Sequence, residues 1–306
     1  MANQAVGRPT ALAGTLGEMI GEFFGTMVLI LFGDGVVATV FLYGNIGGTN
    51  SGPSPFAVEW IVIILGWGLA VMLGIYVAGA ISGAHINPAV TLALAATGRH
   101  PWGKVLPYWG AQVLGAFVAA AILYFVYQGA LVHALSLEHF SIGQIAQPLT
   151  NNGSSGYGWI FYTFPKEFVG LFGAFGTEFL GTALLVGLIL VIVDARNQPV
   201  QSNLNPLIIG LLIVAIGASF GLNTGYAINP ARDFGPRLWI AIVSGGASLS
   251  ADNYYFWIPI VAPLAGGTVG ALIYDYTIGK VLAAKALMKS GTAETKGEAV
   301  REPSVE

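Results

Sequence analysis

A short polar segment occurs twice in this chain, each time within strongly apolar sequence. The first copy is SGAHINPA at residues 82–89, and the second is TGYAINPA at residues 224–231. Asparagine amides and backbone carbonyls form strong hydrogen bonds, and at the depth of a bilayer they are tolerated only where protein buries them or a watery cavity receives them. The repeated segment therefore indicates a polar passage through a membrane.

The Asn-Pro-Ala core of each copy predicts the start of a helix. The prolines suit the first helical position, where an N–H would be unpaired anyway, and the asparagines suit the capping position before it. Two such N-termini meeting at mid-membrane would each present about half a positive charge and so repel cations. The asparagine amides would donate to a passing hydroxyl or water oxygen, whose own hydrogens then point away, which interrupts a proton wire. The motif residues are Asn87, Pro88, Ala89, Asn229, Pro230 and Ala231.

The backbone before each motif is predicted to be non-helical, over residues 79–85 and 217–227. Its carbonyl oxygens would lack intrahelical partners and would accept hydrogen bonds from permeating molecules. His85 is also a candidate pH-dependent gate, although packing beside the motif is the favoured interpretation. The candidate carbonyls are those of Gly83, Ala84, His85, Gly225, Tyr226 and Ala227.

Composition indicates an integral membrane protein. Hydrophobic residues make up 55% of the 306 residues, charged residues only 9%, and the mean hydropathy is +0.72, which exceeds what a soluble core needs. The net charge of -3 offers no basic face for nucleic acid. The absence of cysteine excludes disulfides, thiolate metal sites and thiol nucleophiles. We expect no metal and no cofactor, and no motif for catalysis is present, so an enzyme is not expected.

Apolar stretches of about 20 residues, the length that crosses the hydrocarbon as a helix, predict six membrane spans. Two half-length apolar segments begin at the motifs, and paired short segments of this kind are typical of re-entrant helices in inverted-repeat proteins. We therefore expect an all-α membrane protein with six transmembrane helices and two re-entrant half-helices. The predicted spans are 18–42, 57–79, 103–127, 170–193, 206–222 and 256–282, and the half-helices are 87–98 and 229–242.

The two halves of the chain resemble each other beyond the motifs. EFFGT at residues 22–26 matches EFLGT at residues 178–182, and Gly68 and Gly210 are separated by the same 142 residues as the two motif asparagines. Three spans per half is an odd number, so the second half must be inverted. We expect one channel domain over 1–285, with repeats at about 16–128 and 170–284, and a disordered cytoplasmic tail over 286–306.

Two intramembrane carboxylates recur at equivalent positions of the repeats. Glu22 and Glu178 are ion or proton sites on one interpretation, since intramembrane carboxylates often serve in that way. Their symmetric recurrence favours a structural role, in which they accept backbone N–H bonds from the loops before the motifs.

Positive charge predicts the orientation. Lys166, Arg232 and Arg237 fall on one side of the six-span order, and the other Lys and Arg residues fall on the opposite side, so both termini are expected to be cytoplasmic. The 128–168 connection is then the longest outer loop. It contains Asn152-Gly153-Ser154, which fits a glycosylation sequon, a pattern that is common by chance.

Two Asn-Pro-Ala motifs at matching positions, the second followed directly by Arg-Asp, resemble the signature of the major intrinsic protein family over about residues 18–284. The resemblance is to the aquaglyceroporin or glycerol facilitator branch. It implies the aquaporin-like fold, a homotetramer with one pore per subunit, and a location in the plasma membrane. The function that it implies is passive diffusion of glycerol, water and other small uncharged solutes, with ions and protons excluded.

The resemblance also implies a selectivity filter, formed in that family by two positions in spans two and five and two in the second pore loop. An aromatic corner would receive the CH backbone of a polyol, an arginine would donate two hydrogen bonds to adjacent hydroxyls, and a glycine would supply width. Carried over by distance from the motifs, the filter residues are Trp67, Gly217, Tyr226 and Arg232.

Three further residues match positions that resemble the glycerol-conducting branch, namely Asp233, Arg237 and Pro259. A water-selective aquaporin is the first alternative, and Gly217 together with Asp233 argues against it. An ion-coupled secondary transporter also uses inverted repeats and broken helices, but it would need a coupling-ion site. A closed-pore junction protein is a third class. The sequence does not rank glycerol against urea, dihydroxyacetone, hydrogen peroxide or neutral lactic acid.

Overall fold

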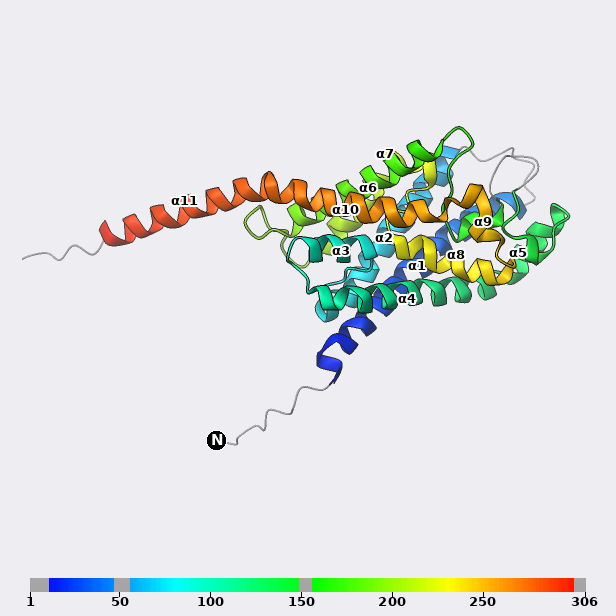
Figure 1. The fold of residues 1–306 in the computed structure, drawn as a ribbon, viewed down its shortest axis with the longest axis horizontal. Helices are drawn as coiled ribbons and strands as arrows, with labels where there is room; N and C mark the ends of the chain where they lie inside the picture. Colours follow the sequence, from blue (N-terminus) through cyan, green and yellow to red (C-terminus); the bar gives the residue numbers. More distant parts are fainter. Residues whose placement is uncertain (1–10, 47–55, 149–155, 300–306) are drawn as a thin grey trace, which may run out of the picture.

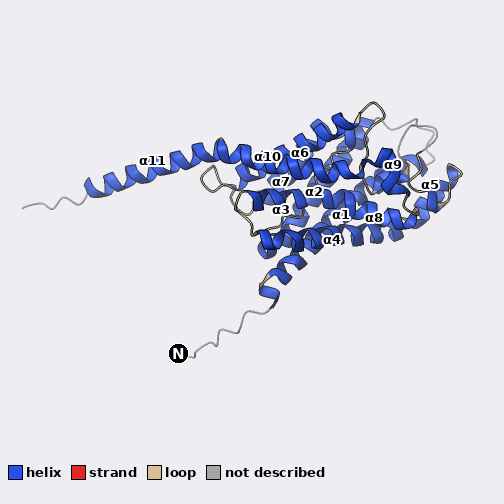
Figure 2. Cartoon of the chain, viewed as in Figure 1, coloured by secondary structure: helices blue, strands red, loops and turns tan. Residues whose placement is uncertain are grey.

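A computed structural model describes residues 11–46, 56–148 and 156–299 (Figure 1). All the regular secondary structure of these residues is helical (Figure 2). The long helices lie roughly side by side as a bundle, and a final helix leaves the bundle at one end (Figure 1). We refer to this end as the α11 end, and to the opposite one, where α5 and α9 lie, as the α5 end.

Six helices of the described residues are long and apolar enough to cross a membrane. This confirms the six predicted spans, with ends that differ from the prediction by a few residues. Each is largely apolar all round, because it faces lipid on one side and packed helices on the other. The six are α1 (Thr15–Ile46), α2 (Phe56–Ser82), α4 (Val105–Val126), α6 (Leu171–Val193), α7 (Asn205–Thr224) and α10 (Ile258–Tyr276).

Two shorter helices begin at the motif prolines. α3 (Pro88–Ala96) packs against α10 and α4, and α8 (Pro230–Val243) packs against α4 and α10. In Figure 1, α3 extends toward the α11 end and α8 toward the α5 end. The two half-helices therefore run from the middle of the bundle toward opposite ends, as an inverted repeat requires.

Close helix contacts in the two halves occur at equivalent residues. A Cβ atom at Gly115 would lie 2.3 Å from the carbonyl oxygen of Phe23, and one at Gly266 would lie 2.1 Å from that of Phe179. Phe23 and Phe179 follow the two repeated glutamates directly. These glycines let α4 approach α1, and α10 approach α6, to backbone contact, which is how small residues act between membrane helices.

The preceding helices run closer to the motifs than the sequence predicted. α2 continues to Ser82 and α7 to Thr224, so the expected non-helical stretches from Gly79 and from Gly217 are wrong in their first part. Gly83 and Gly225 end the two helices with φ angles of 85° and 86°, a left-handed conformation that glycine adopts without steric cost.

The expected outer loop between the repeats is also partly helical. α5 (Gln128–Leu137) and two 3-10 segments, Ile142–Gln144 and Tyr157–Ile160, lie within it. Aromatic side chains hold the second segment and the residues that follow it against the bundle, since Tyr157 and Tyr162 are almost fully buried. The Asn152-Gly153-Ser154 sequon lies outside the described residues.

The chain continues as helix beyond the last span. α11 (Ile278–Ala299) occupies most of the segment for which a disordered tail was expected from residue 286. Its sequence is rich in Ala, Lys, Leu and Glu, which are strong helix formers whatever their polarity. Two short elements, α9 (Ala247–Tyr254) and the 3-10 segment Tyr255–Trp257, join α8 to α10.

The backbone contact at Gly266 generates a prediction. Gly266→Ala places a methyl group on the α6 backbone, and such overpacking costs about 1–3 kcal/mol. We expect the thermal midpoint in detergent, measured by size-exclusion chromatography after heating, to fall by several degrees. Gly176→Ala is the matched control, because a Cβ at Gly176 meets no atom within 4 Å. Equal midpoints for the two variants would contradict the packing argument.

Candidate functional site

The two segments before the motifs share an unusual backbone. Gly83, Ala84 and Ile86 have φ angles of 85°, 51° and 44°, and in the second copy the angles at residues 225, 226 and 228 are 86°, 42° and 43°. Positive φ is costly for residues with side chains, and two such residues per segment persist only when their surroundings hold them. The near identity of the two sets makes the loops conformational copies of each other.

Glu22 lies beneath the first loop and accepts four hydrogen bonds. Its Oε1 accepts from the Ser82 hydroxyl at 2.6 Å and from the backbone N–H of His85 at 2.8 Å. Its Oε2 accepts from the backbone N–H of Ile86 at 2.6 Å and from the side-chain amide of Gln112 at 2.8 Å. The carboxylate is completely buried, so these donors replace the water that would otherwise solvate it.

Glu178 makes the equivalent contacts beneath the second loop. Its Oε1 accepts from the Thr224 hydroxyl at 2.6 Å and from the backbone N–H of Ala227 at 2.9 Å, and its Oε2 accepts from the backbone N–H of Ile228 at 2.7 Å. This carboxylate is also completely buried. Each loop therefore has two consecutive backbone N–H groups bonded to one carboxylate.

The tips of the two loops are joined by the motif asparagines. The Nδ2 of Asn87 donates to the carbonyl of Ile228 at 2.9 Å, and the Nδ2 of Asn229 donates to the carbonyl of Ile86 at 2.9 Å. These reciprocal bonds bring the starts of both half-helices to one place. Because a side-chain amide carries two N–H donors, each asparagine keeps one donor for another partner.

The same asparagines cap the half-helices. The Oδ1 of Asn87 accepts from the backbone N–H of Ala89 at 2.8 Å, and the Oδ1 of Asn229 accepts from that of Ala231 at 3.0 Å. Both asparagines have extended backbone with a proline following, which is the geometry of an N-cap. The orientation of each amide is thus set by the helix that it begins.

A single cavity of about 710 Å³ runs past both motifs. It extends from Trp67, Tyr226 and Arg232 to Asn203 and Asn205 at the start of α7. Most of its wall is aliphatic, and the polar part is formed largely by the two loops. Of the six residues proposed for a carbonyl ladder, the cavity is lined by Gly83, Ala84, His85, Tyr226 and Ala227, while Gly225 lies beside Thr163 and Trp159 instead.

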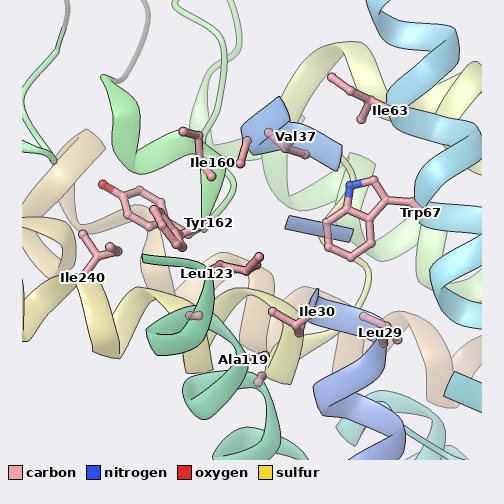
Figure 3. Close-up of a cluster of buried hydrophobic side chains, with 14 of the residues drawn as sticks. Leu29, Ile30, Val37, Ile63, Trp67, Ala119, Leu123, Ile160, Tyr162 and Ile240 are labelled. Atoms are coloured by element: carbon pink, nitrogen blue, oxygen red, sulfur yellow. The ribbon is translucent and has the colours of Figure 1, made fainter. Parts of the chain in front are cut away.

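The predicted filter residues converge at one end of this cavity. The guanidinium carbon of Arg232 lies 3.9 Å from the ring centre of Trp67, a cation–π distance. Trp67 projects from α2 into the buried cluster that also contains Leu29 and Leu123 (Figure 3). Its ring lies against α1 at Gly33, where a Cβ would come within 2.2 Å of a ring carbon.

The structure changes the expected role of Gly217. A Cβ at this position would lie 2.6 Å from the Cζ of Tyr226 and 2.8 Å from a methyl carbon of Ile64. The space beside the glycine is therefore filled by the tyrosine ring and does not widen the lumen directly. The sequence could not show this, because Gly217 and Tyr226 come into contact only in the folded chain, where the loop that follows α7 packs against that helix. The Oη of Tyr226 is buried and has no hydrogen-bond partner among the described residues.

Arg232 has an ion-pair partner that the sequence analysis missed. Its Nη1 donates to Oδ1 of Asp34 at 3.1 Å and to the carbonyl of Phe161 at 3.4 Å. Asp34 lies on α1 and is completely buried. The available signal was a further acidic residue, beyond Glu22, within the first apolar span.

The three residues that resemble the glycerol-conducting branch, Asp233, Arg237 and Pro259, are not among the residues that line the cavity. Arg237 is fully buried, and its Nε donates to Oδ1 of Asp233 at 2.7 Å. The same pair holds the connection before α6, because Asp233 accepts from the backbone N–H of Thr163 at 2.8 Å and Arg237 donates to the Thr163 carbonyl at 2.6 Å. Pro259 is a buried residue in the first turn of α10.

A lysine lies on the same connection, outside the membrane spans. The ammonium of Lys166 is 4.7 Å from the ring centre of Trp159 and 4.8 Å from that of Phe164. Burial among these rings lowers the pKa of Lys166, because an apolar environment disfavours the charged form. Its backbone N–H donates to the carbonyl of Asn223 at 2.9 Å, which ties the connection to the end of α7.

Comparisons with known proteins agree with this geometry. The chain matches the family described as Major intrinsic protein over residues 11–274. It is 41% identical over 261 residues to "Aquaglyceroporin-3" of Trypanosoma brucei brucei, covering 85% of this chain and 78% of the relative. It is 43% identical to the "Probable glycerol uptake facilitator protein" of Thermotoga maritima, covering 84% of this chain and 97% of the relative. The structure is similar to that of the aquaglyceroporin from Plasmodium falciparum, with a TM-score of 0.73, 34% identity, and coverage of 89% of this chain and 100% of the other.

The carboxylate beneath the second loop generates a prediction. Glu178→Ala leaves the backbone N–H groups of Ala227 and Ile228 buried without partners, and each such group costs about 1–3 kcal/mol. We expect a large fall in the thermal midpoint and in the yield of folded protein after purification in detergent. Glu178→Gln, which keeps one acceptor oxygen, should give an intermediate value.

The control for this prediction is Glu167→Ala, which removes an exposed carboxylate from the connection before α6. The interpretation fails if Glu178→Ala and Glu167→Ala have the same midpoint and yield.

Proposed function

The chain belongs to the major intrinsic protein family, and from this premise we propose that it is a passive channel for glycerol, water and other small uncharged solutes, with ions and protons excluded. The observation that carries the proposal is the meeting of two half-helix N-termini in one cavity. Asn87 and Asn229 join them there by reciprocal hydrogen bonds to the opposite loop. Glycerol is the principal solute because the relatives named above are described as aquaglyceroporins and as a glycerol uptake facilitator.

The cavity wall supports a polyol as the permeant. Aliphatic side chains make up most of the cavity lining, while the loops and motif amides supply hydrogen-bonding groups. A molecule with a CH backbone on one side and hydroxyls on the other matches such a wall. Conduction requires binding that is favourable enough for entry and weak enough for exit, which a mixed apolar and polar wall provides.

The half-helix N-termini support the exclusion of cations and protons. Each N-terminus carries about half a positive charge, and the guanidinium of Arg232 adds a further positive group at the end of the cavity. A water or glycerol oxygen that accepts from both asparagine amides would have its hydrogens turned away from the junction. This interrupts the hydrogen-bonded chain of water molecules along which protons would move.

We assign the four filter residues distinct roles. Trp67 and Tyr226 supply the apolar corner for the CH backbone, and the guanidinium N–H groups of Arg232 that bond to none of the described residues donate to hydroxyls. Gly217 acts indirectly, because it leaves room for the Tyr226 ring to lie back from the lumen. Glu22 and Glu178 brace the loops that present the carbonyls.

The proposal extends to the assembly and its orientation. By analogy with the family we propose a homotetramer in the plasma membrane, with both termini cytoplasmic as the charge distribution predicts. The protein is proposed as a transporter without an enzymatic reaction. A water-selective channel is less well supported, since residue 217 is a glycine and the relatives named above carry glycerol-related descriptions.

The direct test is solute flux into proteoliposomes that contain the purified full chain. Stopped-flow light scattering should show glycerol entry far faster than in protein-free liposomes, and entry should need no ion gradient. Glycerol entry at the protein-free rate would overturn the proposal, and entry that requires a proton or sodium gradient would identify an ion-coupled transporter instead.

The contact at Gly217 gives a prediction about selectivity. Gly217→Val requires space that the Tyr226 ring now fills, so the ring must move toward the lumen. We expect glycerol permeability to fall by about tenfold or more, the effect of 1.4 kcal/mol on a barrier, and water permeability to fall much less. The measurement is the ratio of the two permeabilities by stopped flow.

A second substitution and a control make this prediction specific. Tyr226→Ala should give the same glycerol permeability alone and in the Gly217→Val background, because Gly217 acts through the Tyr226 ring. Gly110→Val is the control on α4, where a Cβ meets no atom within 4 Å. An unchanged glycerol-to-water ratio in Gly217→Val would count against the assigned role of this glycine.

A further inference from the structure

The ion pair between Asp34 and Arg232 breaks the internal repeat at both of its members. Asp34 follows Glu22 at the same distance as Leu190 follows Glu178, and Arg232 follows Asn229 at the same distance as Val90 follows Asn87. Each charged residue therefore has an apolar equivalent in the other half.

The apolar equivalents lie in the same part of the other half. Val90 and Leu190 belong to one buried hydrophobic cluster, and both line the cavity. The equivalent positions of the two repeats thus carry aliphatic side chains at one end of the passage and an ion pair at the other. Of the two equivalent positions, only residue 34 is acidic, and it lies at the end of the cavity where the Arg232 guanidinium lies.

The geometry around Asp34 ties it to Arg232. Its Oδ1 accepts from Nη1 of Arg232 at 3.1 Å, and its Oδ2 is buried without a hydrogen-bond partner among the described residues. Removing one partner of a buried ion pair leaves an uncompensated charge, which is strongly unfavourable. The pair engages Nη1 with a residue that is not part of the cavity lining, whereas Arg232 itself lines the cavity, so the other guanidinium N–H groups are those that can donate to permeants. Gly33, the neighbouring residue, leaves room for the Trp67 ring.

We propose that Asp34 is a specificity-determining residue of the channel, which acts by offsetting the charge of Arg232 and holding its guanidinium against the wall. This inference rests on the proposed channel function. An arginine with a buried counter-ion donates to the hydroxyls of a neutral solute but attracts anions weakly. An arginine without one would bind hydroxyls and small anions more tightly and release them more slowly.

The test compares Asp34→Asn with the unaltered chain in proteoliposomes. Asparagine keeps the shape and loses the charge. We expect glycerol permeability to fall by about tenfold, which corresponds to a coupling of about 1.4 kcal/mol between neighbouring residues. Nitrate, a planar anion that pairs with guanidinium, should inhibit the remaining flux relative to gluconate, and it should leave the unaltered chain uninhibited.

A double substitution separates this role from a merely structural one. In an Arg232→Val background, Asp34→Asn should have little further effect on glycerol flux and should confer no inhibition by nitrate. Thr26→Val is the matched control on α1, since it alters a fully buried polar side chain without changing charge, and it should leave flux and nitrate insensitivity as they are.

Each outcome decides the proposal. Glycerol flux in the unaltered chain together with the same flux and nitrate insensitivity in Asp34→Asn overturns it, and so does an equal loss of flux in both backgrounds. If Asp34→Asn yields no folded protein, recovery of folded protein in Asp34→Asn with Arg232→Val supports it, and failure of both variants overturns it. Absence of glycerol flux in the unaltered chain would instead overturn the proposed function.

Discussion

The structure depends on two buried carboxylates that accept backbone N–H bonds from the loops before the motifs. Glu22 bonds to the N–H groups of residues 85 and 86, and Glu178 bonds to those of residues 227 and 228. The loops contain non-glycine residues with positive φ, a conformation that isolated peptide avoids. Because charge-assisted bonds to N–H are strong, the carboxylates hold the backbone in a shape that it would otherwise leave. The same bonds turn the carbonyls of the loop toward other partners.

Everything at the centre of the channel follows from the position of the loops. With both loops held, the asparagines bond across to the opposite loop and cap their own half-helices, so two positive helix ends meet in one cavity. The duplication builds this centre symmetrically. Selectivity for neutral solutes then requires an end that differs from the other, and the pair formed by Asp34 and Arg232 is one place at the cavity where the symmetric scaffold becomes asymmetric. A glycerol and water channel thus combines a repeated frame with charged contacts that are not repeated, namely Asp34 with Arg232 and Asp233 with Arg237.

Much of this arrangement could be predicted from the sequence, because its main signals are local. Long apolar stretches identify spans, proline after asparagine identifies a helix start, and a repeat with an odd number of spans implies inversion. The contacts that sequence reasoning did not find are those that depend on which distant side chain fills a space. The Tyr226 ring occupies the room beside Gly217, and Asp34 meets Arg232 from a helix nearly two hundred residues away in the chain. The helical course of α11 was missed because polarity was taken as a sign of disorder, although its residues are strong helix formers.

Hydrogen exchange of the loop amides tests the central claim most directly. The N–H groups of His85, Ile86, Ala227 and Ile228 belong to loops that line a cavity, yet each is bonded to a buried carboxylate. In the full chain in lipid nanodiscs, these four amides should exchange as slowly as amides in the middle of the spans. Exchange of the four at the rate of unprotected loop amides would show that the carboxylates do not hold the backbone, and would contradict the account.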